Sequence, residues 1–76
     1  MIKNINIILE ALNIDEDIIL QRSFELEEYA WDSLAMVLIQ SYFADELELE
    51  VDPSELASLI TVGELDDFIS EKIDKV

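Results

Sequence analysis

The spacing of apolar side chains limits how this chain can fold more than any other feature. In three stretches they recur every three or four residues, which places them on one face of an α-helix. This spacing predicts a helix over roughly residues 2–13, a second from Asp32 or Ser33 to about Leu47, and a last helix that opens at Thr61. Asp and Ser are both favoured N-cap residues, which supports the start of the second helix.

Capping motifs and connections complete the predicted fold. Asp52–Glu55 combines an N-cap Asp, Pro at the first helical position and Glu three residues after the cap, which predicts a short helix of about residues 53–59. Thr61–Glu64 repeats the capping pattern. Residues 46–52 alternate as a strand does, but a single strand has no visible partner, so we interpret them as a helix end and a loop.

Residues 14–31 show no sustained period and predict a long first loop, which in a small domain is usually functional or packed by its own side chains. The side chains expected to pack it are Ile18, Ile19, Phe24, Leu26 and Trp31. No repeat, low-complexity tract or Gly/Ser linker interrupts the chain, so we expect residues 1–76 to form one domain. The fold class is an all-α bundle with three longer helices, one short third helix and a long first loop.

The composition limits the partners. Nineteen Asp and Glu against four Lys and Arg give a net charge of −15, yet 51% of the residues are hydrophobic, so we expect a folded acidic monomer and not a disordered chain. Such a charge excludes nucleic acid and disfavours anionic membranes. The longest apolar run, Leu34–Ile39, is far too short to span a bilayer, and the N-terminal segment is not a secretory signal. We therefore expect a cytoplasmic protein without membrane insertion.

The chain lacks the residues that most catalytic sites need. It has no Cys and no His, which excludes disulfides, thiolate nucleophiles, the usual zinc sites and the commonest general base. The acids are spread over the surface pattern, which argues against an enzyme built on carboxylates. The acid-rich segment 45–55 lacks the spacing and the central Gly of an EF-hand loop, so we expect no tight metal site.

The helix predicted for residues 33–47 is apolar nearly all the way round its first two turns. Its core stripe is expected to contain Met36, Ile39, Phe43 and Leu47. Leu34 and Leu38 fall on the opposite side, together with Ser41 and Asp45. Two interpretations remain open: the two leucines form a docking patch, or the long loop folds over them.

The start of the second predicted helix, taken together with the last predicted helix, resembles a known family. Trp31-Asp32-Ser33-Leu34 at the start of the second helix, followed by Thr61–Leu65 and Phe68-Ile69, is similar to the acyl carrier protein family. The resemblance covers essentially the whole chain in its length, acidity and order of helices. It implies a carrier and not an enzyme, with 4′-phosphopantetheine from coenzyme A esterified to Ser33.

The resemblance also implies partners and roles. The thiol of the prosthetic group would hold an acyl or aminoacyl group as a thioester in fatty-acid, polyketide or specialised acylation pathways. The implied partners are a phosphopantetheinyl transferase, an acyl- or aminoacyl-loading enzyme, and condensing, transferring or thioesterase enzymes. Asp32 would help to hold the metal ion used by the transferase, and Leu34 would meet partner enzymes. Leu38, Trp31 and Met36 complete the expected recognition set.

Two departures from the family pattern change what we expect of partner recognition. Carriers of fatty acid synthesis usually have acids two and five positions after the modified Ser, where this chain has Ala35 and Leu38. Recognition should therefore be more apolar, with acidic contacts coming either from Asp45, Glu46 and Glu48 or from Glu25, Glu27 and Glu28.

Trp31 and Met36 around Asp-Ser-Leu resemble carriers of secondary metabolism more than the housekeeping carrier of fatty acid synthesis. The alternative function is an unmodified carrier-like module that docks through the start of this helix.

Overall fold

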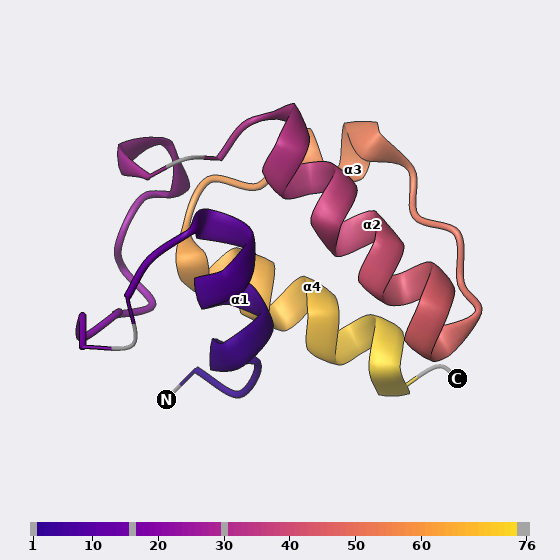
Figure 1. The fold of residues 1–76 in the computed structure, drawn as a ribbon, viewed down its shortest axis with the longest axis horizontal. Coiled ribbons are helices and arrows are strands. Elements are labelled where there is room, and N and C mark those ends of the chain that lie inside the picture. Colours follow the sequence, from indigo (N-terminus) through magenta and orange to yellow (C-terminus); the bar gives the residue numbers. More distant parts are fainter. Residues whose placement is uncertain (1, 16, 30, 75–76) are drawn as a thin grey trace.

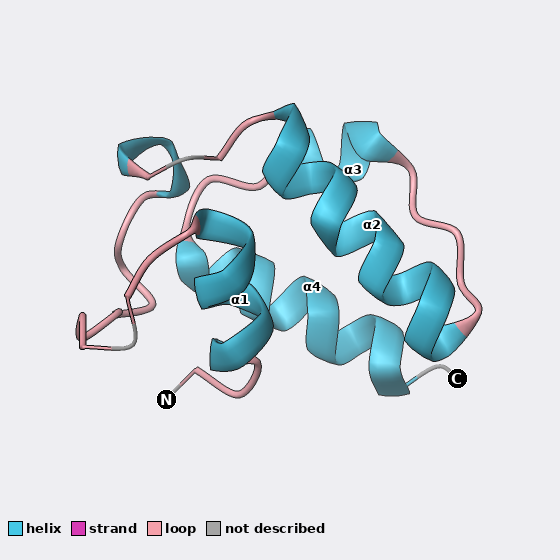
Figure 2. Ribbon diagram, viewed as in Figure 1, coloured by secondary structure: helices cyan, strands magenta, loops and turns pink. Residues whose placement is uncertain are grey.

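The computed structural model describes residues 2–15, 17–29 and 31–74, and over these ranges the regular structure is helical (Figures 1 and 2). The elements are α1 (Ile5–Leu12), the 3₁₀ turn η1 (Leu26–Glu28), α2 (Ser33–Leu47), α3 (Pro53–Ala57) and α4 (Val62–Asp74). Helix α1 packs against both α2 and α4, and α2 also packs against α3. The expected all-α bundle with a short third helix is confirmed.

Local chemistry sets where α1 begins and ends. It begins at Ile5, later than the predicted position 2, because the backbone N–H groups of Lys3 and Asn4 donate to the carboxylate of Asp66. These groups therefore serve a tertiary contact outside the helix. The helix ends at Leu12, and Asn13 follows in the left-handed conformation with φ 56°, which Asn tolerates better than most residues.

The ends of α2 and α3 follow the predicted capping residues. The Asp32 side chain accepts a hydrogen bond from the backbone N–H of Ala35 at 3.1 Å, so Asp32 is the N-cap of α2. After Leu47, Glu48 takes the left-handed conformation and residues 48–52 form the connection to α3, as expected for a helix end and loop. Asp52 caps α3, which ends at Ala57, two residues earlier than predicted.

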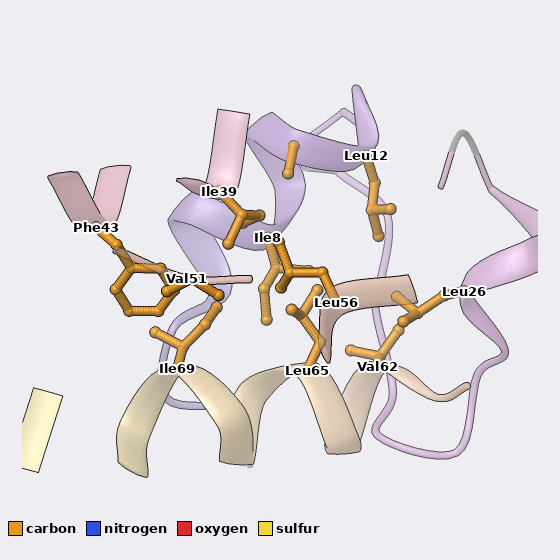
Figure 3. Close-up of a cluster of buried hydrophobic side chains, with 11 residues drawn as sticks. Ile8, Leu12, Leu26, Ile39, Phe43, Val51, Leu56, Val62, Leu65 and Ile69 are labelled. Atoms are coloured by element: carbon orange, nitrogen blue, oxygen red, sulfur yellow. The ribbon is translucent and has the colours of Figure 1, made fainter. Parts of the chain in front are cut away.

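The hydrophobic core lies between α1, α2 and α4 and is closed by residues of the two connections (Figure 3). Phe43 and Ile39 of α2 are fully buried, as predicted, whereas Met36 and Leu47 lie half-buried at its edge. The buried cluster consists of Ile8, Ala11, Leu12, Leu26, Ile39, Phe43, Val51, Leu56, Val62, Leu65 and Ile69. Because Leu26 and Val51 come from outside the long helices, the connections are part of the core.

Backbone hydrogen bonds attach the long first loop to the start of α4. Leu26 N–H donates to the Ile60 carbonyl at 2.8 Å, Val62 N–H to Phe24 at 2.9 Å, and Gly63 N–H to Arg22 at 2.9 Å. A Cβ at position 63 would lie 3.1 Å from both Cβ and the carbonyl oxygen of Arg22, which explains the Gly there. The loop is thus held close to α4.

The packing expected of the loop is only partly right. Leu26 is buried, and Phe24 and Trp31 pack half-buried against the core. Ile18 and Ile19 instead remain exposed, at 45% and 81%. The hydrogen bonds to α4 begin only at Arg22, beyond these two residues, so their part of the loop stays outside the core.

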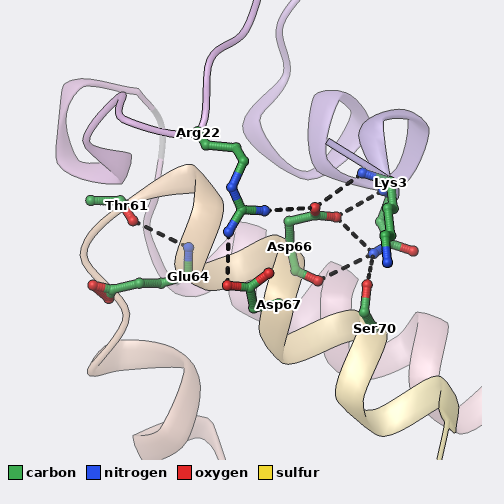
Figure 4. A network of polar contacts seen from close by, with 8 residues as sticks. Lys3, Arg22, Thr61, Glu64, Asp66, Asp67 and Ser70 are labelled. Atoms are coloured by element: carbon green, nitrogen blue, oxygen red, sulfur yellow. Dashed lines mark hydrogen bonds and ion pairs between the residues drawn. The ribbon is translucent and has the colours of Figure 1, made fainter. Parts of the chain in front are cut away.

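A buried carboxylate joins three distant parts of the chain (Figure 4). Asp66 on α4 is 1% exposed, accepts hydrogen bonds from Lys3 N–H, Asn4 N–H and Asn4 Nδ2, and forms an ion pair with Arg22 at 3.1 Å. Burial opposes its ionisation, but the hydrogen bonds from Lys3 and Asn4 and the charge of Arg22 outweigh that effect and lower the pKa of Asp66. The sequence analysis did not find this residue.

Candidate functional site

Ser33 is the first residue of α2 and is exposed to solvent. Since Asp32 performs the capping role, Ser33 is not needed as the N-cap. Among the described residues, its hydroxyl group has no hydrogen-bond partner. A surface serine with an uncommitted hydroxyl at a helix start is open to a modifying enzyme.

The backbone around Ser33 suits a negatively charged substituent. Asp32 Oδ1 accepts from Ala35 N–H, and the Asp32 carbonyl accepts from Met36 N–H at 3.0 Å. The N–H groups of Ser33 and Leu34 belong to the first turn, which has no intrahelical acceptors. Both these N–H groups and the helix dipole favour a phosphate bound at Ser33, whereas the nearby Asp32 carboxylate opposes it.

The structure separates the two leucines that the sequence analysis grouped together. Leu34 is 78% exposed, so the long loop does not cover it. Leu38 is half-buried against the core and lies beside Ile7 of α1 and Tyr42. Leu34 is therefore the more exposed of the two leucines, because α1 covers part of the side of α2 that carries Leu38. The residue that accompanies Leu34 in solvent is Val37, which is 53% exposed and one helical turn away.

Trp31 and Met36 both pack half-buried against the core. The indole Nε1 of Trp31 is buried and has no hydrogen-bond partner among the described residues. The ring lines an open pocket of about 310 Å³ together with Glu27, Ala57, Leu59 and Ile60. Trp31 thus fixes the approach of the chain to Ser33, while its neighbour Ile60 is a further exposed apolar residue.

The structure gives a physical reason for the missing acids on α2. Ala35 is 3% exposed and Leu38 lies against α1, so an acid at either position would be desolvated. Of the acids considered instead, Glu27 lies beside Trp31 close to the site. Asp45 follows Ser33 by about 18 Å at the rise of an α-helix and so lies at the far end of α2.

Comparison with known proteins identifies the family. Residues 5–69 match the family described as "Phosphopantetheine attachment site". The chain belongs to the acyl carrier protein family. It is 30% identical over 69 residues to an acyl carrier protein of Clostridium perfringens, a match that covers 91% of each chain. It is 29% identical over 68 residues to that of Thermotoga maritima, covering 90% of this chain and 84% of the relative. No solved structure gives a significant match.

Family membership agrees with the chemistry of the described residues. An acyl carrier protein is not an enzyme, and it holds 4′-phosphopantetheine covalently. Within ranges 2–15, 17–29 and 31–74, no group of three or more Asp and Glu side chains is placed to hold a metal ion. Over the same ranges, no helix is both long and apolar enough to cross a membrane.

The exposed position of Val37 is the feature of the site that sequence reasoning missed. A helical projection from Ser33 places Val37 only about 40° away, on the same side as the serine. The sequence alone gives this angle. It does not show that α1 buries one side of α2, and only this contact determines which leucine stays in solvent.

Proposed function

We propose that Ser33 carries the 4′-phosphopantetheine group of this acyl carrier protein. The observation that supports this assignment is an exposed serine hydroxyl at the first position of α2, left uncommitted because Asp32 caps the helix. In the reaction, Ser33 Oγ loses its proton and bonds to the β-phosphorus of coenzyme A. The pyrophosphate bond breaks and adenosine 3′,5′-bisphosphate leaves.

The thiol at the end of this arm then carries an acyl or aminoacyl group as a thioester. The chain itself contains no Cys, so the prosthetic group supplies the thiol that thioester chemistry requires. Partners are the transferase, a loading enzyme, and condensing, transferring or thioesterase enzymes of the cytoplasm. The more apolar first half of α2 favours a specialised acylation or polyketide pathway over housekeeping fatty acid synthesis.

Asp32 has two roles in this proposal. It caps α2 through Ala35 N–H, and its carboxylate helps to hold the metal ion in the complex with the transferase. Its carboxylate carries two oxygens, and the cap uses only Oδ1, which leaves the other as a ligand for that ion.

Intact-mass spectrometry tests the assignment. The purified apo chain is incubated with coenzyme A, Mg²⁺ and a broad-specificity phosphopantetheinyl transferase, and its mass should rise by one phosphopantetheinyl group. Ser33→Ala should remain unchanged, whereas the matched control Ser41→Ala, which removes another exposed hydroxyl of α2, should be modified like wild type. An unmodified wild-type chain would instead favour the alternative, an interaction module that uses exposed Leu34 and Val37 without a prosthetic group.

A further inference from the structure

The first loop exposes two large apolar side chains that the fold does not use. Ile19 is 81% exposed and Ile18 is 45% exposed, and neither packs against the core. We call residues 17–20 the loop tip. A single exposed apolar residue is common on protein surfaces, but two consecutive isoleucines in a loop form an apolar surface that is available to a partner.

Both ends of this loop are fixed to helices. On the α1 side, Ile14 N–H donates to the Leu9 carbonyl at 3.0 Å. On the α4 side, Gly63 N–H donates to the Arg22 carbonyl at 2.9 Å. Because the chain between these two anchors is short, the loop tip loses less conformational freedom on binding than a free chain end would.

A pocket next to the loop tip can take an apolar side chain. It is open and has a volume of about 440 Å³. Its apolar walls are Ile2 of the N-terminal segment and Leu20, the last residue of the loop tip, and Gln21, Arg22 and Ser23 complete the lining. Since Leu20 follows Ile19 directly, the pocket and the exposed isoleucines form one continuous apolar surface.

Carboxylates flank this apolar surface. Ile18 N–H donates to the Asp15 carbonyl at 3.1 Å, and this turn places Asp15 beside the loop tip. Asp15 and Asp17 are both exposed, and neither forms an ion pair with a residue in the described part of the chain. Both carboxylates are therefore open to cations of a partner.

The nearby cations do not cancel this negative charge. Arg22, which lines the pocket, is paired with Asp66 at 3.1 Å and with Asp67 at 2.8 Å. Lys3 is exposed, but it supplies one positive charge, whereas residues 13–21 hold three acids and no base. The surface is complementary to a partner that presents Lys or Arg next to apolar side chains.

The loop tip is remote from the candidate modification site. Figure 1 shows the loop after α1 at the lower left of the molecule, whereas α2 begins at its top. A partner bound to the loop tip leaves Ser33 exposed. One protein can therefore hold the loop while another acts on the start of α2.

We propose that the loop tip and its adjacent pocket form a docking surface for a basic, apolar segment of a partner protein. Apolar side chains of the segment contact Ile18 and Ile19 and enter the pocket, while its Lys or Arg residues pair with Asp15 and Asp17. The inference goes beyond the proposed function and does not depend on the modification of Ser33. A second copy of this chain is disfavoured as the occupant because two surfaces of the same strong negative charge repel.

A nuclear magnetic resonance titration with a defined probe tests the proposal. The probe is a peptide with blocked ends in which Lys and Leu alternate, and the control peptide has Ser in place of every Leu. Amide shifts of the isotope-labelled full chain report where each peptide binds and with what Kd. Ile19→Ser is compared with the matched control Leu34→Ser, which changes an equally exposed apolar residue on α2. Asp17→Asn is compared with Asp45→Asn, an exposed acid at the far end of α2.

The Leu-containing peptide should shift the amides of residues 17–23 most strongly. Ile19→Ser should raise its Kd at least about threefold, because the variant removes an apolar contact. Leu34→Ser should change the Kd by less than about 1.5-fold, since it lies outside the contact. Asp17→Asn should raise the Kd about twofold at low salt and less at high salt, and Asp45→Asn should have a smaller effect, through net charge alone. Thermal melts confirm that each variant is folded.

Several results would overturn the docking inference without bearing on Ser33, which mass spectrometry tests separately. They are an equal Kd for the two peptides, the strongest shifts at residues 33–44, or a Leu34→Ser variant that weakens binding as much as Ile19→Ser. Without peptide, phosphatidylcholine vesicles that bind wild type but not Ile19→Ser would make a lipid surface the occupant instead. Sedimentation of a dimer that Ile19→Ser dissociates would make a second copy the occupant.

Discussion

Burial of individual side chains decides which residues near Ser33 are free to act on partners. Leu34 and Leu38 are one turn apart in sequence, yet Leu34 is 78% exposed and Leu38 packs beside α1. The helical period predicts that they share a side but not which neighbour covers it. At this scale the sequence predicted Ile39 and Phe43 of the core and offered Asp32 as one of two caps. It did not show that α1 packs beside Leu38.

The pair offers a direct comparison. Leu34→Asp should change the free energy of unfolding by less than about 0.5 kcal/mol, because the side chain is already in solvent. Leu38→Asp should cost about 2 kcal/mol, since it desolvates a carboxylate against the core. Urea unfolding followed by circular dichroism measures both. Equal losses for the two variants would contradict the exposure of Leu34.

Asp66 makes stability depend on pH. Its pKa is lowered in the folded chain from the ordinary 3.8, despite burial, by hydrogen bonds from Lys3 and Asn4 and by Arg22. A carboxyl group with a lowered folded-state pKa contributes stability that is fully present above its unfolded-state pKa and is lost as the pH falls through its folded-state value. This contribution should therefore be constant near neutrality, begin to fall as the pH approaches 3.8, and be lost as the pH drops further through the lowered folded-state pKa.

Asp66→Asn tests this prediction. At pH 7 the variant should lose about 2 kcal/mol, because an amide N–H group replaces an acceptor of Lys3 and Asn4 and leaves buried donors unpaired. Its unfolding free energy should also fall less steeply than that of wild type below pH 4. Urea titrations at several pH values measure this, and a parallel decline in both proteins would contradict the role of Asp66.

Each element owes its boundaries partly to local chemistry and partly to tertiary contacts. The cap of α3 was predicted, and the start of α2 was predicted at Asp32 or Ser33, because both features depend on residues within one turn. The start of α1 was predicted too early, since Lys3 and Asn4 bond to a residue more than 60 positions away. The exposed Ile18 and Ile19 were missed for a related reason: apolarity gave no sign of where the loop meets α4.

The cap of α2 can be separated from the role proposed for Asp32 in modification. Asp32→Ala should cost about 1 kcal/mol, the usual effect of losing an N-cap. Asp32→Asn should retain most of the stability, because its amide oxygen still accepts from Ala35 N–H. If the carboxylate also holds the metal ion of the transferase, both variants should be modified slowly. Thermal melts report the capping role and transferase rates report the role in metal binding. Modification of Asp32→Asn at the wild-type rate would refute the role in metal binding.

The net charge of the molecule both attracts basic partners and destabilises the fold. From residue 23 to 71 every charged side chain is acidic, so a basic partner meets a negative field around the uncharged stretch of α2, residues 33–44. Composition predicted this field, but not the uncharged face at its centre. That face depends on α1 covering the opposite side of α2.

Repulsion among these charges should limit stability. If salt or millimolar divalent cations relieve about 1 kcal/mol of it, the Tm should rise by about 4–8 °C for a chain of this size. Differential scanning calorimetry at low and physiological ionic strength provides the measurement. A Tm that responds to neither salt nor divalent cations would show that repulsion is not limiting.

The most direct test of the central claim is to locate the prosthetic group on the modified chain. Tandem mass spectrometry of the wild-type product should place a single phosphopantetheinyl group on Ser33, within the fragment that contains Trp31 and Leu34. The group on another serine, or no modification under conditions that modify an established carrier, would contradict the account.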